Sequence, residues 1–398
     1  MTTALPYLIF DGDNHYYEAE DAFTRHMDPK MRKRCMEWAE VRGRRSLLVG
    51  GKVNRFIPNP TFDPVARPGC LDDYYQGKNG AGLSIRDAFG ELEPIHPEYR
   101  DRDARLKVMD DQRVQGAFFF PTLGVGMEEA LINDPQAIIA SFRAFNRWLY
   151  EDWGFSYQDR IFAAPYMHLI DLDNAIAELE WALERDARLV VMRSAPVRSN
   201  GISRSLADPM YDPYWARINE AGITVAFHGG DAGYGRYLDD WGEGGTVESF
   251  KSSSFKSVVG GSRAPFDTFA ALVCHGLFHR HTNLRVVSIE MGALWVPWLM
   301  QSFERAYGIS PKEFVEDPAE TFKRHIWLNP FHEDDVKSLA DLVGAENLIM
   351  GSDWPHAEGM KTPVEYVREL QQLKEGEIKT IMRDNGISLI TPRPQSAA

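Results

Sequence analysis

Short apolar segments that fit buried β-strands alternate with helical patterns along most of the chain. We place strands at the apolar segments 7–13, 114–122, 160–169, 189–196, 223–230, 284–292, 325–331 and 348–359. Between them, segments such as 135–153 and 171–184 carry apolar residues on one helix face. Eight strand–helix units predict an α/β fold, a distorted (β/α)8 TIM barrel. An open nucleotide-binding sheet is the alternative, but no Gly-x-Gly-x-x-Gly follows the first strand.

Two long segments interrupt this alternation. Residues 41–94 and 231–264 are rich in Gly and aromatic residues and lack a clear apolar period. They have too few periodic apolar positions to build a second core, so we expect long inserted loops over the C-terminal face of the barrel. Residues 1–398 are therefore predicted to form a single barrel domain.

Ionisable residues stand where several of the predicted strands end. Asp13 and His15 are separated by one residue, so on a strand they point to the same face. His228 ends the fifth strand, and Asp353 follows the apolar part of the eighth. Each residue alone also fits an ordinary turn or strand terminus. Together these nitrogen and oxygen ligands predict one divalent ion, Zn²⁺ first, with Mn²⁺ or Fe²⁺ as alternatives.

Further ionisable residues follow other strands and are candidates for catalysis or substrate binding. Glu290 ends the sixth strand, and we assign it a catalytic role together with Asp353. We assign substrate binding to four residues, Arg193, His168, His332 and His356. The guanidinium of Arg193 can pair equally well with a substrate carboxylate or with an internal acid. Each of the three histidines taken alone fits a hydrogen-bonded loop histidine equally well. His275, His279 and His281 precede the sixth strand on a helix outside the barrel, so we expect structural roles for them.

Several sequence motifs resemble one known family. The matching stretches are DGDNHYYE at 11–18, FFFPTLG at 118–124, FHGG at 227–230, GLFHRHTNLRVVSIEMGALWVPW at 276–298, and GSDWPHAEG at 351–359, the most specific. The chain resembles the amidohydrolase superfamily, in the branch that includes aminocarboxymuconate-semialdehyde decarboxylase and γ-resorcylate-type decarboxylases. The resemblance implies a metal-dependent barrel enzyme and a homodimer.

This sequence departs from the family pattern at two positions. The first-strand His-x-His signature has Asp13 in its first position, and Glu290 stands where many relatives place a histidine. No lysine suited to carbamylation ends the fourth strand, where Arg193 lies instead. The resemblance therefore implies a mononuclear metal site rather than a binuclear one.

Two reactions fit these residues, and a role without catalysis stays open. In the first, the metal chelates a carboxylated aromatic or cyclic substrate, Asp353 moves a proton to carbon, and CO₂ leaves. In the second, Asp353 accepts a proton from metal-bound water that attacks an amide, ester, lactone or C–C bond. Decarboxylation is our preferred interpretation. The alternative of another class is a barrel that binds a small molecule through a decayed metal site.

Composition narrows the class of partner to a small molecule. The formal net charge of −14 argues against binding to nucleic acid or an anionic membrane. No apolar run approaches the roughly 20 residues that span a bilayer. Cys35, Cys70 and Cys274 are widely spaced, as expected for reduced thiols in a cytoplasmic protein.

Overall fold

The computed structural model describes residues 5–80, 82–251 and 253–394. Its centre is a set of parallel strands in two hydrogen-bonded sheets, ordered β1-β5-β6 and β12-β11-β10-β7. The strands are β1 (Ile9–Tyr16), β5 (Val114–Pro121), β6 (Ile161–Ala163), β7 (Leu189–Arg193), β10 (Thr224–His228), β11 (Arg285–Ile289) and β12 (Ile326–Leu328). Each lies within a predicted strand segment or overlaps one.

Backbone hydrogen bonds join the two sheets into a closed barrel. Between β6 and β7, the Met167 amide donates to the Val191 carbonyl at 2.8 Å. Between β12 and β1, residues 348–354 bridge both neighbours. The Ile349 amide donates to the β12 carbonyl of Leu328 at 2.9 Å, and the Gly12 amide donates to Met350 at 2.9 Å. The structure therefore confirms the distorted (β/α)8 barrel, with the eighth position held by bridges rather than by a continuous strand.

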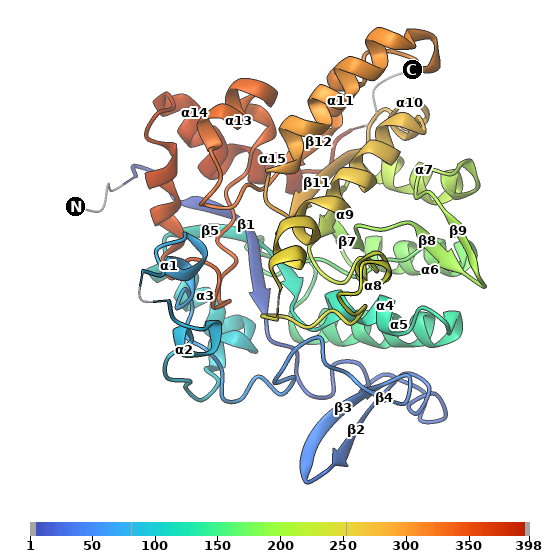
Figure 1. Cartoon of the computed structure of the whole chain (residues 1–398), viewed down its shortest axis with the longest axis vertical. Helices are drawn as coiled ribbons and strands as arrows, with labels where there is room; N and C mark the ends of the chain where they lie inside the picture. Colours follow the sequence, from blue (N-terminus) through green and yellow to red (C-terminus); the bar gives the residue numbers. More distant parts are fainter. Residues whose placement is uncertain (1–4, 81, 252, 395–398) are drawn as a thin grey trace.

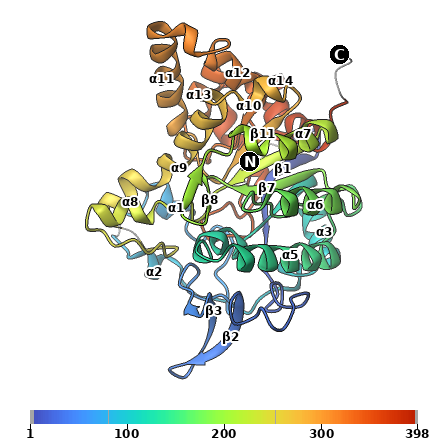
Figure 2. The same cartoon turned by 90° about the vertical axis from the view of Figure 1, so that its right-hand side faces the viewer.

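Helices pack around the barrel, as the two perpendicular views show (Figure 1; Figure 2). The longer ones are α3 (Arg102–Asp111), α5 (Pro135–Asp152), α6 (Leu172–Leu183), α7 (Asp212–Ala221), α9 (Ser254–Cys274), α11 (Trp295–Ile309), α12 (Pro318–His325) and α13 (Val336–Val343). Asp171 caps the start of α6 and accepts a hydrogen bond from the Asn174 amide. Every described helix is too short or too polar to cross a membrane.

Shorter elements lie between these helices and strands or follow them. They are α4 (Met127–Ala130), α10 (Leu277–Arg280), α14 (Glu375–Lys379), α15 (Asn385–Ile390) and the hairpin of β8 (Val197–Ser199) and β9 (Ile202–Arg204). The three predicted structural histidines lie outside the barrel and contact different partners: His275 bonds Ser205, His281 bonds Asp212, and His279 approaches Glu316.

Both predicted insertions contain more regular structure than the sequence pattern indicates. The strands β2 (Met36–Val41), β3 (Arg44–Val49) and β4 (Lys52–Val53) form an antiparallel sheet that projects from the lower end of the molecule (Figure 1). Strand β2 begins before the predicted start of the first insertion at residue 41. Strands β3 and β4 lie within the insertions, as do the short helices α1 (Asp72–Tyr75), α2 (Ile85–Ala88) and α8 (Gly235–Asp240). Helix α9 begins at Ser254, within the segment 231–264 that was predicted as a loop, and continues through Pro265.

Candidate metal centre and active site

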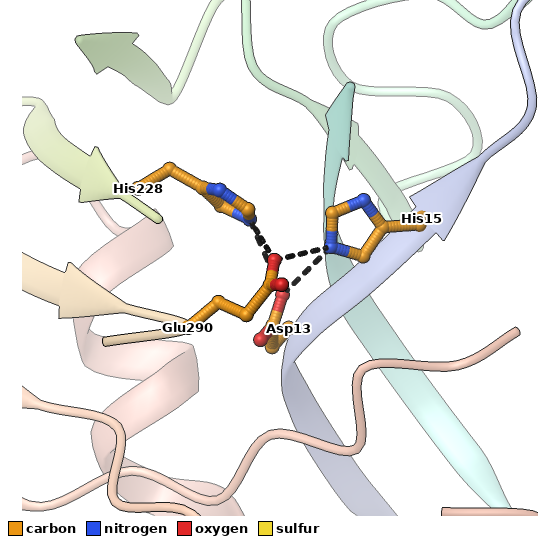
Figure 3. Close-up of side chains that lie close together, drawn as sticks. All are labelled: Asp13, His15, His228 and Glu290. Atoms are coloured by element: carbon orange, nitrogen blue, oxygen red, sulfur yellow. Dashed lines mark ion pairs between the residues drawn. The ribbon is translucent and has the colours of Figure 1, made fainter. Parts of the chain in front are cut away.

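Four ionisable side chains from three strand ends converge inside the barrel (Figure 3). Asp13 and His15 come from β1, His228 is the last residue of β10, and Glu290 follows β11. His15 Nε2 lies 3.3 Å from Asp13 Oδ1 and 3.4 Å from Glu290 Oε2. His228 Nε2 lies 3.7 Å and 3.2 Å from the same two oxygens. The structure therefore brings together three predicted metal ligands, Asp13, His15 and His228, and the predicted catalytic residue Glu290.

Asp353 joins this cluster through His15. Its Oδ1 atom lies 3.3 Å from His15 Nε2 and 2.6 Å from His356 Nδ1. A second group of possible metal ligands accordingly consists of His15, Glu290, Asp353 and His356, and it shares His15 and Glu290 with the first. Asp353 has a φ of 55° and Glu290 a φ of 50°, a left-handed conformation that costs energy for residues with a Cβ. Both strained residues are the predicted catalytic carboxylates.

Asp11 fixes β1 to the segment that carries Asp353, a role that no sequence pattern predicts. Its buried carboxylate accepts hydrogen bonds from the Ser352 amide at 2.9 Å and from the Ser352 hydroxyl at 2.5 Å. It also accepts a hydrogen bond from the Asn14 side chain at 3.0 Å. At Gly351, a Cβ would lie 2.6 Å from the Cβ of Asp13, so only glycine allows this approach.

The atoms that converge here fit a bound cation. Asp13 Oδ1, His15 Nε2, His228 Nε2 and Asp353 Oδ1 are buried and have no hydrogen-bond partner among the described residues. Buried polar atoms without partners are costly, so they point to a ligand that satisfies them. Ligand atoms around one tetrahedral ion at about 2.1 Å are spaced by about 3.4 Å, close to the separations observed. The residues present therefore fit one divalent metal.

Histidine orientation also suits metal binding. The Nδ1 atom of His228 lies 2.7 Å from the Gly229 carbonyl, and as a donor it leaves Nε2 free to bind a metal. Nε2 of His356 lies 2.9 Å from the Thr122 hydroxyl, which itself donates to the Tyr16 carbonyl at 2.8 Å. Nε2 of His356 is therefore the donor in that contact, and its Nδ1 atom faces Asp353.

The crowded carboxylates shift the ionisation of the cluster. Burial raises the pKa of Asp353 well above its usual range, and the charges of Glu290 and Glu358 raise it further. Burial opposes ionisation of Asp13 as well, but the rings of His15 and His228 outweigh it and lower the pKa of Asp13. Burial also disfavours charge on His15, yet Asp13 and Glu290 raise its pKa to about 9. The neighbouring carboxylates thus favour positive charge within the cluster, which a bound cation would supply.

Three of the predicted substrate contacts have partners elsewhere. Arg193 donates to Glu129 Oε2 at 2.6 Å and lies 3.5 Å from Glu128, the internal-acid alternative. His332 Nε2 lies 2.7 Å from Asp72 of α1, and His168 lies against Phe142 with ring centroids 6.0 Å apart. The residues at a strand end can be predicted from the sequence. The loop residues that pair with them, such as Glu129 and Asp72, cannot.

His356 is the predicted substrate contact that lines a cavity beside the metal cluster. This cavity has a volume of about 410 Å³, and its floor includes His15, Glu290 and His356. Sequence reasoning missed Glu358 on the same floor, although it lies in the specific GSDWPHAEG stretch; burial and the charge of Glu290 raise its pKa to about 7. A second cavity of about 300 Å³ lies beside His228 and shares Glu290 with the first.

Together, a closed barrel and a nitrogen–carboxylate cluster at the C-terminal strand ends define a metal-dependent barrel enzyme. The amidohydrolase family model matches residues 94–389, so the chain belongs to the amidohydrolase family. This finding confirms the family resemblance of the sequence motifs.

Solved structures agree with this assignment. An amidohydrolase from Mycobacterium avium subsp. paratuberculosis K-10 is 43% identical with a TM-score of 0.93, over 98% of this chain and 99% of that one. A 2,6-dihydroxybenzoate decarboxylase from Rhizobium shares the fold at 19% identity and a TM-score of 0.57, over 82% of this chain and 96% of that one. A dihydroxybenzoic acid decarboxylase from Polaromonas sp. JS666, with bound manganese and the inhibitor 2-nitroresorcinol, has 15% identity and a TM-score of 0.58, over 81% of this chain and 93% of that one. Among curated proteins, none matches the sequence.

Proposed function

We propose that this protein is a metal-dependent carboxy-lyase that removes CO₂ from a carboxylated aromatic or cyclic substrate. The observation that carries the proposal is the position of His15 Nε2, 3.3 Å from both Asp13 Oδ1 and Asp353 Oδ1 without a hydrogen bond to either, at the floor of a cavity. Fold similarity to two dihydroxybenzoate decarboxylases supports this choice of reaction over hydrolysis.

We assign the metal ligands as Asp13, His15, His228 and Asp353. Zn²⁺ is the expected ion because it accepts mixed nitrogen and carboxylate ligands, and Mn²⁺ is the alternative, since the Polaromonas decarboxylase holds manganese. The ion would supply positive charge that binds the substrate carboxylate and an adjacent oxygen. Strand β7 supplies no ligand for a second metal, because it ends in Arg193, which pairs with Glu129.

Asp353 is the proposed proton donor. When the C–C bond to the carboxylate breaks, its electron pair stays on the substrate carbon, CO₂ leaves, and that carbon takes the proton. His356 lies 2.6 Å from Asp353 and is held by Thr122, so it orients the acid and contacts the substrate. Glu290 is partly exposed and borders both cavities, which suits a group that exchanges protons with a bound molecule.

Metal analysis tests the proposed site. Protein purified without added metal should contain about one equivalent of a divalent ion, and Asp353→Asn should bind that ion at least ~10-fold more weakly. The matched control is Asp72→Asn, whose carboxylate contacts His332 outside the cluster; it should retain its metal. Absence of stoichiometric metal, with unchanged metal affinity in Asp353→Asn, would favour a binding protein without catalysis.

A substrate panel tests the reaction. The metal-loaded protein should release CO₂ from at least one hydroxybenzoate, and Asp353→Asn should lower that rate by about 100-fold or more. Ring-opened acid, alcohol or amine from a panel of lactones, esters and amides, without CO₂ from any hydroxybenzoate, would instead establish the hydrolase alternative.

A further inference from the structure

The cavity of about 410 Å³ beside the metal cluster has a polar floor and apolar walls. Its floor carries the candidate metal and proton-transfer residues His15, Glu290 and His356. The walls above them consist mainly of apolar side chains from the first insertion, with one from the second: Phe56, Ile57, Phe62, Val65, Phe89, Leu92 and Phe250. A volume of about 410 Å³ falls within the ~300–1,000 Å³ of sites that enclose a drug-sized ligand.

Specific contacts hold these walls in place. Phe56 packs over Gly126. A Cβ at position 126 would lie 2.5 Å from the ring, so this position requires glycine. The Ser249 amide donates to the Phe56 carbonyl at 2.8 Å and thereby joins the two insertions. Across the same junction, Phe89 and Phe250 meet edge to face with ring centroids 5.0 Å apart.

The remaining wall is tied to the barrel. Val65 and Glu93 exchange two backbone hydrogen bonds of 2.8 and 2.9 Å, which join the stretches 56–66 and 89–92. Phe62 stacks on Tyr17 at 4.7 Å, and Tyr17 donates to the Pro355 carbonyl at 3.3 Å, two residues beyond Asp353. The apolar walls are therefore connected to two of the segments that supply the cluster, the end of β1 and the segment that carries Asp353.

We infer that the substrate carries an extended apolar substituent, which occupies the space between these walls while its carboxylate lies at the polar floor. A single hydroxybenzoate ring cannot cover all the apolar side chains that line a cavity of about 410 Å³, so part of their surface would stay in contact with water. Arg86 is the one Arg or Lys among the described residues that line the cavity, and it lies on α2 in the first insertion. The inference deepens the proposed function and rests on it for the placement of the carboxylate.

Binding of alkylated salicylates tests the length of the site. Dissociation constants of 4-n-alkyl and 5-n-alkyl salicylates, from methyl to hexyl, are measured by titration calorimetry on the metal-loaded full chain. In at least one series, Kd should fall about threefold to fourfold for each added methylene, until the chain reaches the rim. A Kd that stays constant or rises with chain length in both series would overturn the inference.

Two exposed leucines of the first insertion provide a matched pair. Leu92 lines the cavity and is 51% exposed, whereas Leu83 is 48% exposed and is absent from the lining. Leu92→Asp should weaken binding of the hexyl compound at least ~10-fold and leave that of the methyl compound within about twofold. Leu83→Asp should change neither. Equal effects of the two variants would contradict an apolar binding surface at Leu92.

The same compounds separate this inference from the proposed reaction. If affinity rises with chain length but no member releases CO₂, the carboxy-lyase proposal fails and the apolar site stands. If short hydroxybenzoates lose CO₂ while longer ones bind more weakly, the reaction stands and the extended substrate is refuted.

Discussion

Two carboxylates in the cluster differ in their access to a bound molecule. The side chain of Asp13 is 2% exposed, and that of Glu290 is 24% exposed and borders both cavities. A deeply buried carboxylate beside two histidines is suited to hold a metal, whereas an accessible one can exchange a proton with substrate. We therefore assign metal binding to Asp13 and proton transfer to Glu290, although Glu290 also belongs to both groups of possible metal ligands.

The variant Glu290→Gln separates these two roles. We expect it to keep about one equivalent of metal and to lower kcat by about 100-fold or more, because general acid–base groups contribute 10²–10⁴-fold. Metal content and CO₂ release are measured on the same preparation. Glu333→Gln is the matched control, since its side chain is 27% exposed and outside both cavities. Loss of the metal from Glu290→Gln alone would make Glu290 a ligand.

At the scale of elements, helix α3 positions the first strand through one buried arginine. The Arg105 guanidinium donates to the side-chain oxygen of Asn14 at 2.6 Å and to the carbonyls of His15 and Glu98 at 2.7 Å. It also lies 4.3 Å from the ring centroid of Trp354, next to Asp353. Arg105 thus contacts two of the three segments that supply the proposed ligands, β1 and the segment that carries Asp353.

We predict that Arg105→Lys destabilises the fold and the metal site together. Lysine cannot reach all three acceptors, and each buried acceptor left unsatisfied costs about 1–3 kcal/mol. Urea unfolding should show a loss of about 2–4 kcal/mol, and metal affinity should fall about 10-fold. The control Arg102→Lys, on the same helix, removes a hydrogen bond of 3.3 Å to the Glu151 carbonyl and keeps a cation that can lie over the Tyr157 ring, so it should cost less than about 1 kcal/mol. Equal losses in both variants would refute this positioning role.

The order of strands and helices was predictable from apolar periodicity. The convergence of Asp13, His15, His228 and Glu290 followed because the ends of parallel strands meet at one edge. The sheet of β2–β4 was not predictable in this way, because MEWAEV and RRSLLV mix polar and apolar residues without strict alternation. Its turn signal is local: Arg42 and Gly43 both have positive φ, at 53° and 75°. The partners of Arg193 likewise depend on how the loop after β5 returns to the barrel, which no local pattern encodes.

At the scale of the whole molecule, an apolar surface formed by residues of α9 and the start of α11 is exposed. Leu294 is 79% exposed and Trp298, on the same side of α11, is 50% exposed. Phe266 of α9 stacks on Trp298 with ring centroids 4.1 Å apart, so both helices contribute to this surface. Helix α11 projects from the top of the molecule in both views (Figure 1; Figure 2). Adjacent exposed apolar side chains of this kind mark sites of association.

We therefore expect the protein to form a homodimer through α9 and α11. Light scattering after size exclusion should give twice the mass of the chain at micromolar concentration, and the double variant Leu294→Glu/Trp298→Glu should give the mass of one chain. Burying two charges without partners at a contact of about 800 Å² per subunit opposes association. Ile202→Glu is the control, since Ile202 is 57% exposed but lies on β9. A single-chain mass for the unmodified protein, or equal dissociation by Ile202→Glu, would exclude this interface.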